Sequence, residues 1–168
     1  MERDEDFSQY VSVRWTALTR SAVLLGCTAH EAEDLVQNTL AACYASWDKV
    51  VKARERDAYV YRVLVNMQGK GRRRRWWGEQ PTQNLPEHAS ADPTRQVDET
   101  DALRLALNAL GSANRAAVVL RYYGQLSESE TAQALGVAPG TVKSRLNRAL
   151  AQLSKDPNII DLETEGTS

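Results

Sequence analysis

The sequence has few of the residues that form covalent or metal-bound sites. Two cysteines and two histidines occur among 168 residues, and no CxxC pair is present. Free cysteines are among the most buried side chains in proteins, so Cys27 and Cys43 are expected to be packing residues. Because His30 and His88 lie far apart in the chain, neither a disulfide framework nor a metal site is predicted, and no cofactor is expected.

Long apolar runs and the signatures of catalysis are also missing. No stretch approaches the roughly 18 consecutive apolar residues of a membrane span, and the acidic opening MERDEDF is unlike a signal peptide. We therefore expect a cytoplasmic protein. The sequence shows no nucleophile paired with a base, no carboxylate pair and no Gly-rich phosphate loop, so an enzyme is not predicted.

What the sequence does have is charge that is segregated along the chain. The overall charge of −1 conceals five blocks. Their net charges are −4 for residues 1–50, +7 for 51–78, −5 for 79–101, +5 for 102–155 and −4 for 156–168. Two basic blocks flanked by acidic chain predict two separate surfaces that face a polyanion.

The composition also predicts where the chain divides. Residues 79–97 include the stretch EQPTQNLPEHAS and three prolines, with almost no apolar periodicity, which is typical of a linker. On both sides apolar residues recur at intervals of three and four, as in amphipathic helices. The predicted fold is all-α, with two small helical domains at 1–78 and 98–155, joined by a flexible Pro-rich linker, and an acidic tail at 156–168.

In the first domain, Thr28 and Glu31 have the spacing of a capping box that opens the helix AHEAEDLVQNTLAACYASW. One stripe of this helix is predicted to face the core: Ala32, Leu35, Val36, Thr39, Leu40, Cys43 and Trp47. The opposite face carries Asp34, Gln37, Asn38 and Ala41, and most amphipathic helices have such a face simply because it is solvated. The preceding segment has apolar residues at helical intervals and is expected to pack beside it.

The next helix, DAYVYRVLVNMQGKGRRRRWW, combines a buried run with a basic end. Asp57 is the predicted N-cap. Tyr59 to Met67 is apolar apart from Arg62 and Asn66. The Asn66 amide therefore either hydrogen-bonds to neighbouring backbone, as buried amides do, or reads a base edge. Cations for phosphates and flat rings for unstacked bases then follow each other, although basic runs also occur as solvated helix ends. These residues are Arg72, Arg73, Arg74, Arg75, Trp76 and Trp77.

The second domain contains a helix-turn-helix pattern. Ser127 and Glu130 form another capping box, Gly136 is the predicted turn residue with positive φ, and Pro139 suits the first turn of the next helix. The buried stripe of that helix is predicted to be Val142, Leu146, Ala149, Leu150 and Leu153. Its outer face carries Ser144, Asn147, Arg148 and Ala151, with Thr141, Lys143 and Arg145 at the flanks. A short, polar, basic face of this kind suits the DNA major groove.

Taken together, these motifs resemble the sigma-70 family of RNA polymerase sigma factors, of the extracytoplasmic function (ECF, group 4) type. The resemblance rests on AHEAEDLVQNTL, DAYVYRVLVNM and LSESETAQALGVAPGTVKSRLNRA, and it covers roughly residues 7–155. It implies that the two domains are region 2 and region 4. It also implies a factor that binds core RNA polymerase and directs promoter-specific initiation of transcription.

For the first domain, the resemblance implies two binding surfaces. Asp34, Gln37 and Asn38 would dock on the clamp helices of the largest polymerase subunit. Family members commonly have Glu at the last of these positions, so Asn38 is a departure. Asn66 would contact a flipped-out base of the minus 10 element, with Arg62 and the basic, aromatic end of the helix close to the same DNA.

For the second domain, the resemblance implies recognition of the minus 35 element. The matching positions are Arg121, Glu128, Ser129, Gly140, Thr141, Lys143, Ser144, Asn147 and Arg148. Ala138 departs from the serine or proline found in many relatives, so the recognition helix is expected to lack a good N-cap, at a cost of about 1 kcal/mol at most.

The resemblance implies three kinds of partner: core polymerase through its clamp helices and flap, promoter DNA, and an anti-sigma factor able to hold the protein at the membrane. The acidic linker would pass near the RNA exit path. Two alternatives remain open from the residues. One is a stand-alone repressor or activator that binds a palindromic operator as a dimer, and the other is a helical adaptor that binds only proteins. The tail is expected to be either disordered or a small docking segment containing Ile159, Ile160 and Leu162.

Overall fold

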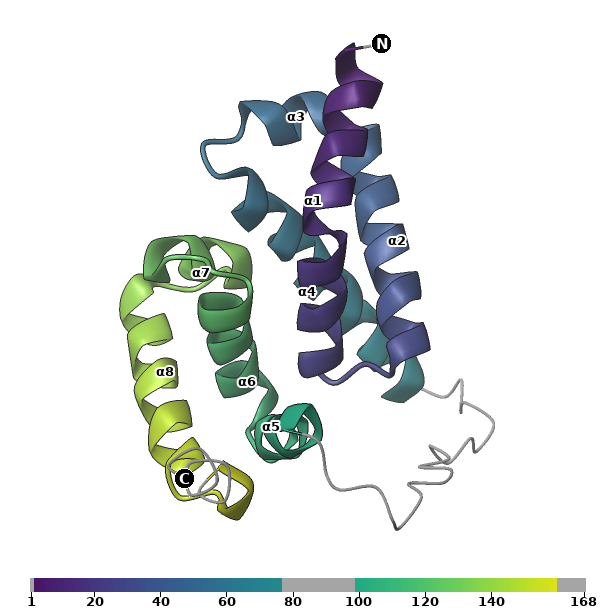
Figure 1. Ribbon diagram of the computed structural model, residues 1–168. Helices are drawn as coiled ribbons and strands as arrows, with labels where there is room; N and C mark the ends of the chain where they lie inside the picture. Colours follow the sequence, from purple (N-terminus) through teal and green to yellow (C-terminus); the bar gives the residue numbers. More distant parts are fainter. Residues whose placement is uncertain (1, 77–98, 160–168) are drawn as a thin grey trace, which may run out of the picture.

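The computed structural model describes the backbone of residues 2–76 and 99–159, and the side chains of residues 2–71 and 101–159. All the regular elements within these ranges are helical, which confirms the all-α prediction (Figure 1). In chain order they are α1 (Glu2–Leu24), α2 (Ala29–Ala45), α3 (Trp47–Lys52), α4 (Arg56–Trp76), α5 (Glu99–Asn108), α6 (Ser112–Val118), the π-helix η1 (Val119–Tyr123), α7 (Glu128–Leu135) and α8 (Pro139–Leu153).

Helices α1 to α4 form one bundle, in which α2 packs against both α1 and α4. Apolar residues spaced three and four apart turn one stripe of each helix inward. The largest fully buried side chains here include Leu18, Val36, Trp47 and Leu64. Cys43 is also buried, as predicted, and burial raises the pKa of its thiol to about 11. Cys27 is buried too, so both cysteines are packing residues.

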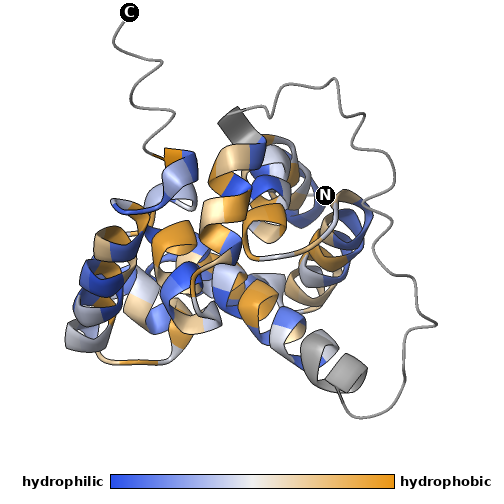
Figure 2. Cartoon of the chain, turned by 90° about the horizontal axis from the view of Figure 1, so that it is seen from below, coloured by the Kyte–Doolittle hydropathy of each residue, from blue (hydrophilic) through white to orange (hydrophobic). Residues whose placement is uncertain are grey.

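The second half is built around α6, which packs against α8. Its core includes Leu107, Leu120, Val142 and Leu146, all nearly inaccessible to solvent. Figure 2 shows hydrophobic residues gathered where helices face one another, with hydrophilic residues on the outer sides. Burial of these leucine and valine side chains supplies the main stabilising free energy, about 1.5–3 kcal/mol for each.

The two halves also pack against each other, α4 against α7 and α1 against η1. A Cβ added to Gly124 would lie 3.1 Å from Cζ of Tyr61 and 2.7 Å from the Leu120 carbonyl oxygen, so only glycine fits at this approach. The Tyr61 hydroxyl hydrogen-bonds to the buried Ser21 hydroxyl at 3.0 Å. The guanidinium of Arg20 lies 5.3 Å from the ring centroid of Tyr123.

Arg115 joins the ends of two helices across this contact. Its guanidinium donates to the carbonyl oxygens of Leu107 and Leu110, both at 2.8 Å. These carbonyls lie at and just beyond the C-terminal end of α5, where intrahelical N–H partners are missing. It also reaches the Leu25 carbonyl of the other half at 3.3 Å, and Gln68 donates to that same carbonyl at 3.0 Å. The two halves, predicted as separate domains, therefore share one continuous hydrophobic core.

The predicted linker at 79–97 lies outside the described residues, as do most of the predicted tail and its Ile160 and Leu162. Of the tail, only residues 156–159 are described, and Ile159 is half-buried. No helix in the described ranges combines the length and the apolar character needed to cross a membrane.

Candidate nucleic-acid and polymerase interfaces

The capping box that the sequence predicts at the start of α2 is present. The Thr28 hydroxyl accepts the backbone N–H of Glu31 at 3.2 Å, and the Thr28 N–H donates to the Glu31 carboxylate at 3.0 Å. This pair satisfies two of the orphan N–H groups of the first turn. The predicted core stripe of α2 is buried, with only Leu35 half-exposed.

The outer face of α2 is fully available in the free protein. Asp34, Gln37 and Asn38 are exposed together on this face, and Ala41 continues it by one turn. Within the described residues, Asp34 pairs only with His30, which is also exposed and whose Nε2 lies 3.6 Å from the carboxylate. Two amides and a carboxylate therefore stand on a rigid helix with most of their hydrogen-bonding capacity unused.

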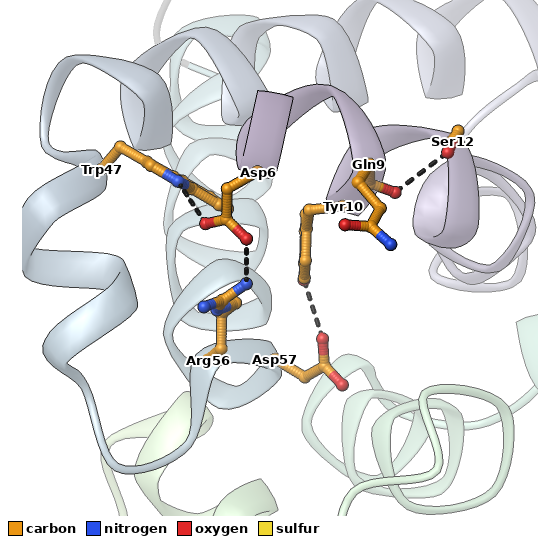
Figure 3. Close-up of polar contacts among 7 residues, drawn as sticks. All are labelled: Asp6, Gln9, Tyr10, Ser12, Trp47, Arg56 and Asp57. Carbon is orange, nitrogen blue, oxygen red and sulfur yellow. Dashed lines mark hydrogen bonds and ion pairs between the residues drawn. The ribbon is translucent and has the colours of Figure 1, made fainter. Parts of the chain in front are cut away.

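Asp6 of α1 fixes the junction between α3 and α4 (Figure 3). Its carboxylate accepts the Trp47 indole N–H at 2.9 Å and pairs with the Arg56 guanidinium at 3.4 Å. Trp47 is 1% exposed, so its N–H needs this acceptor to avoid an unsatisfied buried donor. The start of α4 is thereby held against α1.

The sequence-based assignment of Asp57 as an N-cap is wrong. Helix α4 begins at Arg56, and the Asp57 carboxylate is used in tertiary contacts (Figure 3). It accepts the Tyr10 hydroxyl at 2.8 Å and pairs with Arg14 at 2.7 Å. Burial, and secondarily Asp57, raises the pKa of the Tyr10 hydroxyl far above its usual range, so Tyr10 remains a donor. The contacts with Tyr10 and Arg14 of α1 thus replace the capping role predicted for Asp57.

Arg62 and Asn66 lie on one exposed strip of α4, while Val60, Tyr61 and Leu64 are buried on its other sides. The expectation of a largely buried helix is correct except at this strip. Asn66 is not a buried amide satisfied by backbone: its side chain is exposed and has no hydrogen-bond partner among the described residues. The strip instead presents a cation and an unused amide, one helical turn apart.

The basic, aromatic end of this helix is described only in part. The backbone of residues 72–76 continues α4, whereas the side chains of Arg72 to Trp76, and Trp77 altogether, lie outside the described residues. Their assignment to DNA stays a prediction. Gly69 and Lys70, which precede them, are both exposed, and the sequence analysis did not select either of them.

A groove of about 540 Å³ runs between α2 and α4. It is lined by Leu35 and Asn38 of α2 and by Met67, Lys70 and Gly71 of α4. Asn38 therefore lies at the edge of a depression with an apolar floor. Sequence spacing alone could not predict that these residues lie together, because their contact depends on how α2 crosses α4.

The helix-turn-helix is formed as the sequence predicts. The Ser127 hydroxyl accepts the Glu130 N–H at 3.0 Å, and the Ser127 N–H donates to the Glu130 carboxylate at 3.3 Å. Gly136 ends α7 in the left-handed region with φ of 67°, which glycine adopts without a Cβ penalty. Ala138 precedes Pro139 at the start of α8 and supplies no side-chain cap, again as expected.

The outer face of α8 is broad, polar and basic. Most of the predicted contact residues are exposed on it: Gly140, Lys143, Ser144, Asn147 and Arg148, with Thr141 half-buried at its edge. The predicted buried stripe is correct for Val142, Leu146 and Ala149 but wrong for Leu150, which is 42% exposed. Leu153, the last residue of the predicted stripe, is half-buried and packs against the core, so Leu150 is exposed because it lies at the edge of the stripe.

The other predicted minus 35 residues lie beside this face but differ in environment. Glu128 and Ser129 are exposed in the first turn of α7. Arg121 is half-buried in η1, donates to the Leu126 carbonyl at 3.3 Å and lies over the Tyr122 ring at 5.6 Å. Its guanidinium keeps other N–H groups for an external acceptor, since arginine carries five.

Metal-ligating side chains form no cluster within the described ranges. No group of three or more His, Cys, Asp or Glu side chains there could hold a metal ion. A groove of about 680 Å³ lies between the start of α1 and α3 and includes none of the predicted contact residues. The arrangement can bind extended polar surfaces.

Comparisons with known proteins agree with this geometry. A model of sigma-70, region 4, matches residues 100–153, which comprise α5 to α8. The RNA polymerase sigma-E factor of Streptomyces coelicolor is 41% identical over 158 residues, 94% of this chain and 89% of that relative. The ECF RNA polymerase sigma factor SigM of Mycobacterium tuberculosis is 33% identical over 150 residues, 89% of this chain and 76% of that relative.

The chain belongs to the ECF RNA polymerase sigma factors. A solved relative, the sigma factor RpoE in complex with the anti-sigma factor NepR from Bartonella quintana, has a TM-score of 0.76 at 29% identity and covers 90% of this chain and 96% of its own. CnrH, solved with the cytosolic domain of CnrY, shares the fold, with a TM-score of 0.68 at 23% identity over 98% of this chain and 91% of its own. The ECF sigma factor fold thus spans both halves of the molecule.

Proposed function

We propose that this ECF sigma factor binds core RNA polymerase and directs it to promoters through two DNA-binding faces, one on α4 and one on α8. The observation that carries the proposal is that both faces are exposed, basic and polar, and are built on helices whose other sides are buried. Membership of the family, at 41% identity over most of the chain, supports the same activity. Residues 1–78 would form region 2, 98–155 region 4, 79–97 the linker and 156–168 the tail.

The polymerase-binding surface is the outer face of α2. Asp34 offers a carboxylate, while Gln37 and Asn38 offer amides, so the face suits an arginine-rich helical partner such as the clamp helices of the largest subunit. Asn38 cannot form an ion pair, and its contact would be a neutral hydrogen bond.

The minus 10 surface is the exposed strip of α4. Arg62 would bind the backbone of the non-paired strand, and the Asn66 amide, which offers a donor and an acceptor, would read an extruded base. Capturing such a base offsets the few kcal/mol that unstacking costs. Arg72 to Arg75, Trp76 and Trp77 would extend this contact by charge and stacking.

The minus 35 surface is the outer face of the helix-turn-helix. Lys143 and Arg148 would anchor phosphates or guanines, while Ser144 and Asn147 would contact base edges in the major groove. Gly140, at the start of α8, would approach the DNA backbone with an N–H that has no side-chain cap, whereas Thr141, whose N–H donates to the Ala138 carbonyl at 3.0 Å, would contact it through its hydroxyl. Arg121 and Ser129 would contact the flanking backbone, whereas the Glu128 carboxylate, which phosphates repel, would accept from a base amino group.

The mechanism is binding without covalent chemistry. Docking on the polymerase would hold the two faces over promoter elements, and base capture at α4 would stabilise the melted strand. An anti-sigma factor is proposed as the regulator, since the similar sigma factor RpoE was solved in complex with the anti-sigma factor NepR. The protein would act in the cytoplasm, where this partner could hold it at the membrane.

The proposal is tested by run-off transcription from fragmented source-genome DNA, with purified core polymerase alone and with this protein added. We expect discrete start sites that require the protein and that disappear when Asp34 and Gln37 are both replaced by Ala. The matched control replaces Gln9 and Asp48, an exposed amide on α1 and an exposed carboxylate on α3, by Ala and should leave the start sites unchanged. Tight operator binding by the free protein without core-dependent initiation would instead indicate a stand-alone regulator.

A further inference from the structure

Two exposed glycines occur in the second half of α4, at positions 69 and 71. Glycine inside a helix is less favourable than alanine because it loses more backbone entropy on folding. Neither residue has a positive φ, and a Cβ added at either would meet nothing within 4 Å. Backbone conformation and internal packing therefore do not explain why these positions lack a side chain.

The two glycines lie on opposite sides of the helix. Position 69 follows Arg62 by seven residues and Asn66 by three, so all three share one strip at 3.6 residues per turn. Position 71 lies two residues further, about 200° around the helix at 100° per residue. It lines the groove against α2, together with Leu35 and Met67.

Gly69 thus leaves a bare patch of backbone in line with the cation and the amide of the strip. Lys70 is exposed beside it, and four arginines begin three residues further along the chain. A polyanion drawn to these charges meets helix backbone at position 69, where any other residue would hold it off by at least a Cβ atom, about 1.5 Å from Cα. A protein partner would not need this combination of bare backbone and surrounding cations.

We propose that Gly69 is a positioning residue for promoter DNA, whose missing side chain lets the sugar-phosphate backbone of the strand held by Arg62 and Asn66 lie directly against α4. This inference rests on the proposed function. The closer approach places the strand so that the Asn66 amide, one turn earlier, meets the extruded base. The role of Gly69 is steric, so a larger side chain should have a larger effect.

The experiment compares four variants in holoenzyme assembled with core polymerase: Gly69→Ala, Gly69→Leu, Gly71→Ala and Gly71→Leu. Thermal unfolding should show that both alanine variants are stabilised similarly, with Tm raised by about 2–4 °C, because alanine favours the helix. Core binding should be unchanged in all four. Open-complex formation on a promoter found by run-off should fall at least about fivefold for Gly69→Ala and further for Gly69→Leu.

The Gly71 variants should form open complexes within about twofold of the unsubstituted protein, a difference of less than 0.5 kcal/mol. Open-complex formation by Gly69→Ala at the level of the unsubstituted protein would overturn the proposal. An equal loss in Gly69→Ala and Gly71→Ala would also overturn it, because the cause would then be a stiffer helix and not a steric barrier. If the unsubstituted protein directs no core-dependent initiation, the proposed function itself fails, which the same experiment shows separately.

Discussion

Helices α4 and α8 carry the two proposed DNA faces in different ways. Helix α4 is packed by α2, α3 and α7, and over residues 56–68 only the narrow strip with Arg62 and Asn66 is exposed. Helix α8 packs through one side, which leaves a broad face that includes Lys143 and Arg148. A narrow strip suits one unpaired strand, whereas a broad convex face suits the major groove of a duplex. The extent of burial thus separates melting from duplex recognition.

The largest expected effect comes from the packing that makes α4 narrow. Leu64 is fully buried, so Leu64→Ala should destabilise the protein by about 2–5 kcal/mol in urea unfolding. Leu150→Ala, on the exposed turn of α8, is the matched control and should change stability by no more than about 0.5 kcal/mol. Similar losses in both would show that α8 is as deeply packed as α4.

The difference between α4 and α8 also predicts that Asn66 acts on single-stranded DNA and Asn147 on duplex DNA. Asn66→Ala should weaken holoenzyme binding to a pre-melted minus 10 strand by about 1–3 kcal/mol, because a base loses its donor and acceptor. Asn147→Ala should cause a loss of the same order only on duplex DNA that contains the upstream element. Filter binding to the two templates measures both effects. A loss for Asn66→Ala on duplex upstream DNA would contradict the division of roles.

A smaller effect concerns the helix starts. Thr28→Ala and Ser127→Ala each remove a capping box and should cost about 1 kcal/mol. Ala138→Ser should add the cap that α8 lacks and stabilise it by up to about 1 kcal/mol. Thermal unfolding measures all three. No gain from Ala138→Ser would mean that Pro139 alone already fixes the start of α8.

A further effect is a pH dependence of stability that appears only above neutral pH. Burial raises the pKa of Cys43 to about 11 from its usual 9, so the folded state favours the protonated thiol. Its contribution to stability is fully present below pH 9 and is lost as pH rises toward 11. The difference between the unsubstituted protein and Cys43→Ala, measured by urea unfolding at pH 7, 9 and 10.5, should therefore shrink at high pH. A constant difference would show that the thiol is solvated in the folded protein.

Local sequence patterns predicted most of the helices and their ends. The two capping boxes, the core stripe of α2 and the turn at Gly136 depend on residues within a few positions, so spacing alone was sufficient. The same reasoning gave the uncapped start of α8. These features are correct because neighbouring residues determine them.

Tertiary contacts account for the errors and omissions. Asp57 was expected to cap α4, but Tyr10 and Arg14 lie more than 40 residues earlier and bind its carboxylate. Leu150 has the right spacing for the core stripe but lies at its edge, where it is 42% exposed. The contact between the two halves at Gly124 has no local signature, because its cause is a tyrosine of α4. The roles of the individual binding residues stay predictions.

The central claim is that α4 and α8 each read one promoter element. The direct measurement is selection of active promoters from a randomised library by holoenzyme containing the unsubstituted protein, Asn66→Ala or Asn147→Ala. We expect two conserved sequence blocks, with the downstream block relaxed only by Asn66→Ala and the upstream block relaxed only by Asn147→Ala. Relaxation of the same block by both variants, or of neither block by either, would contradict the account.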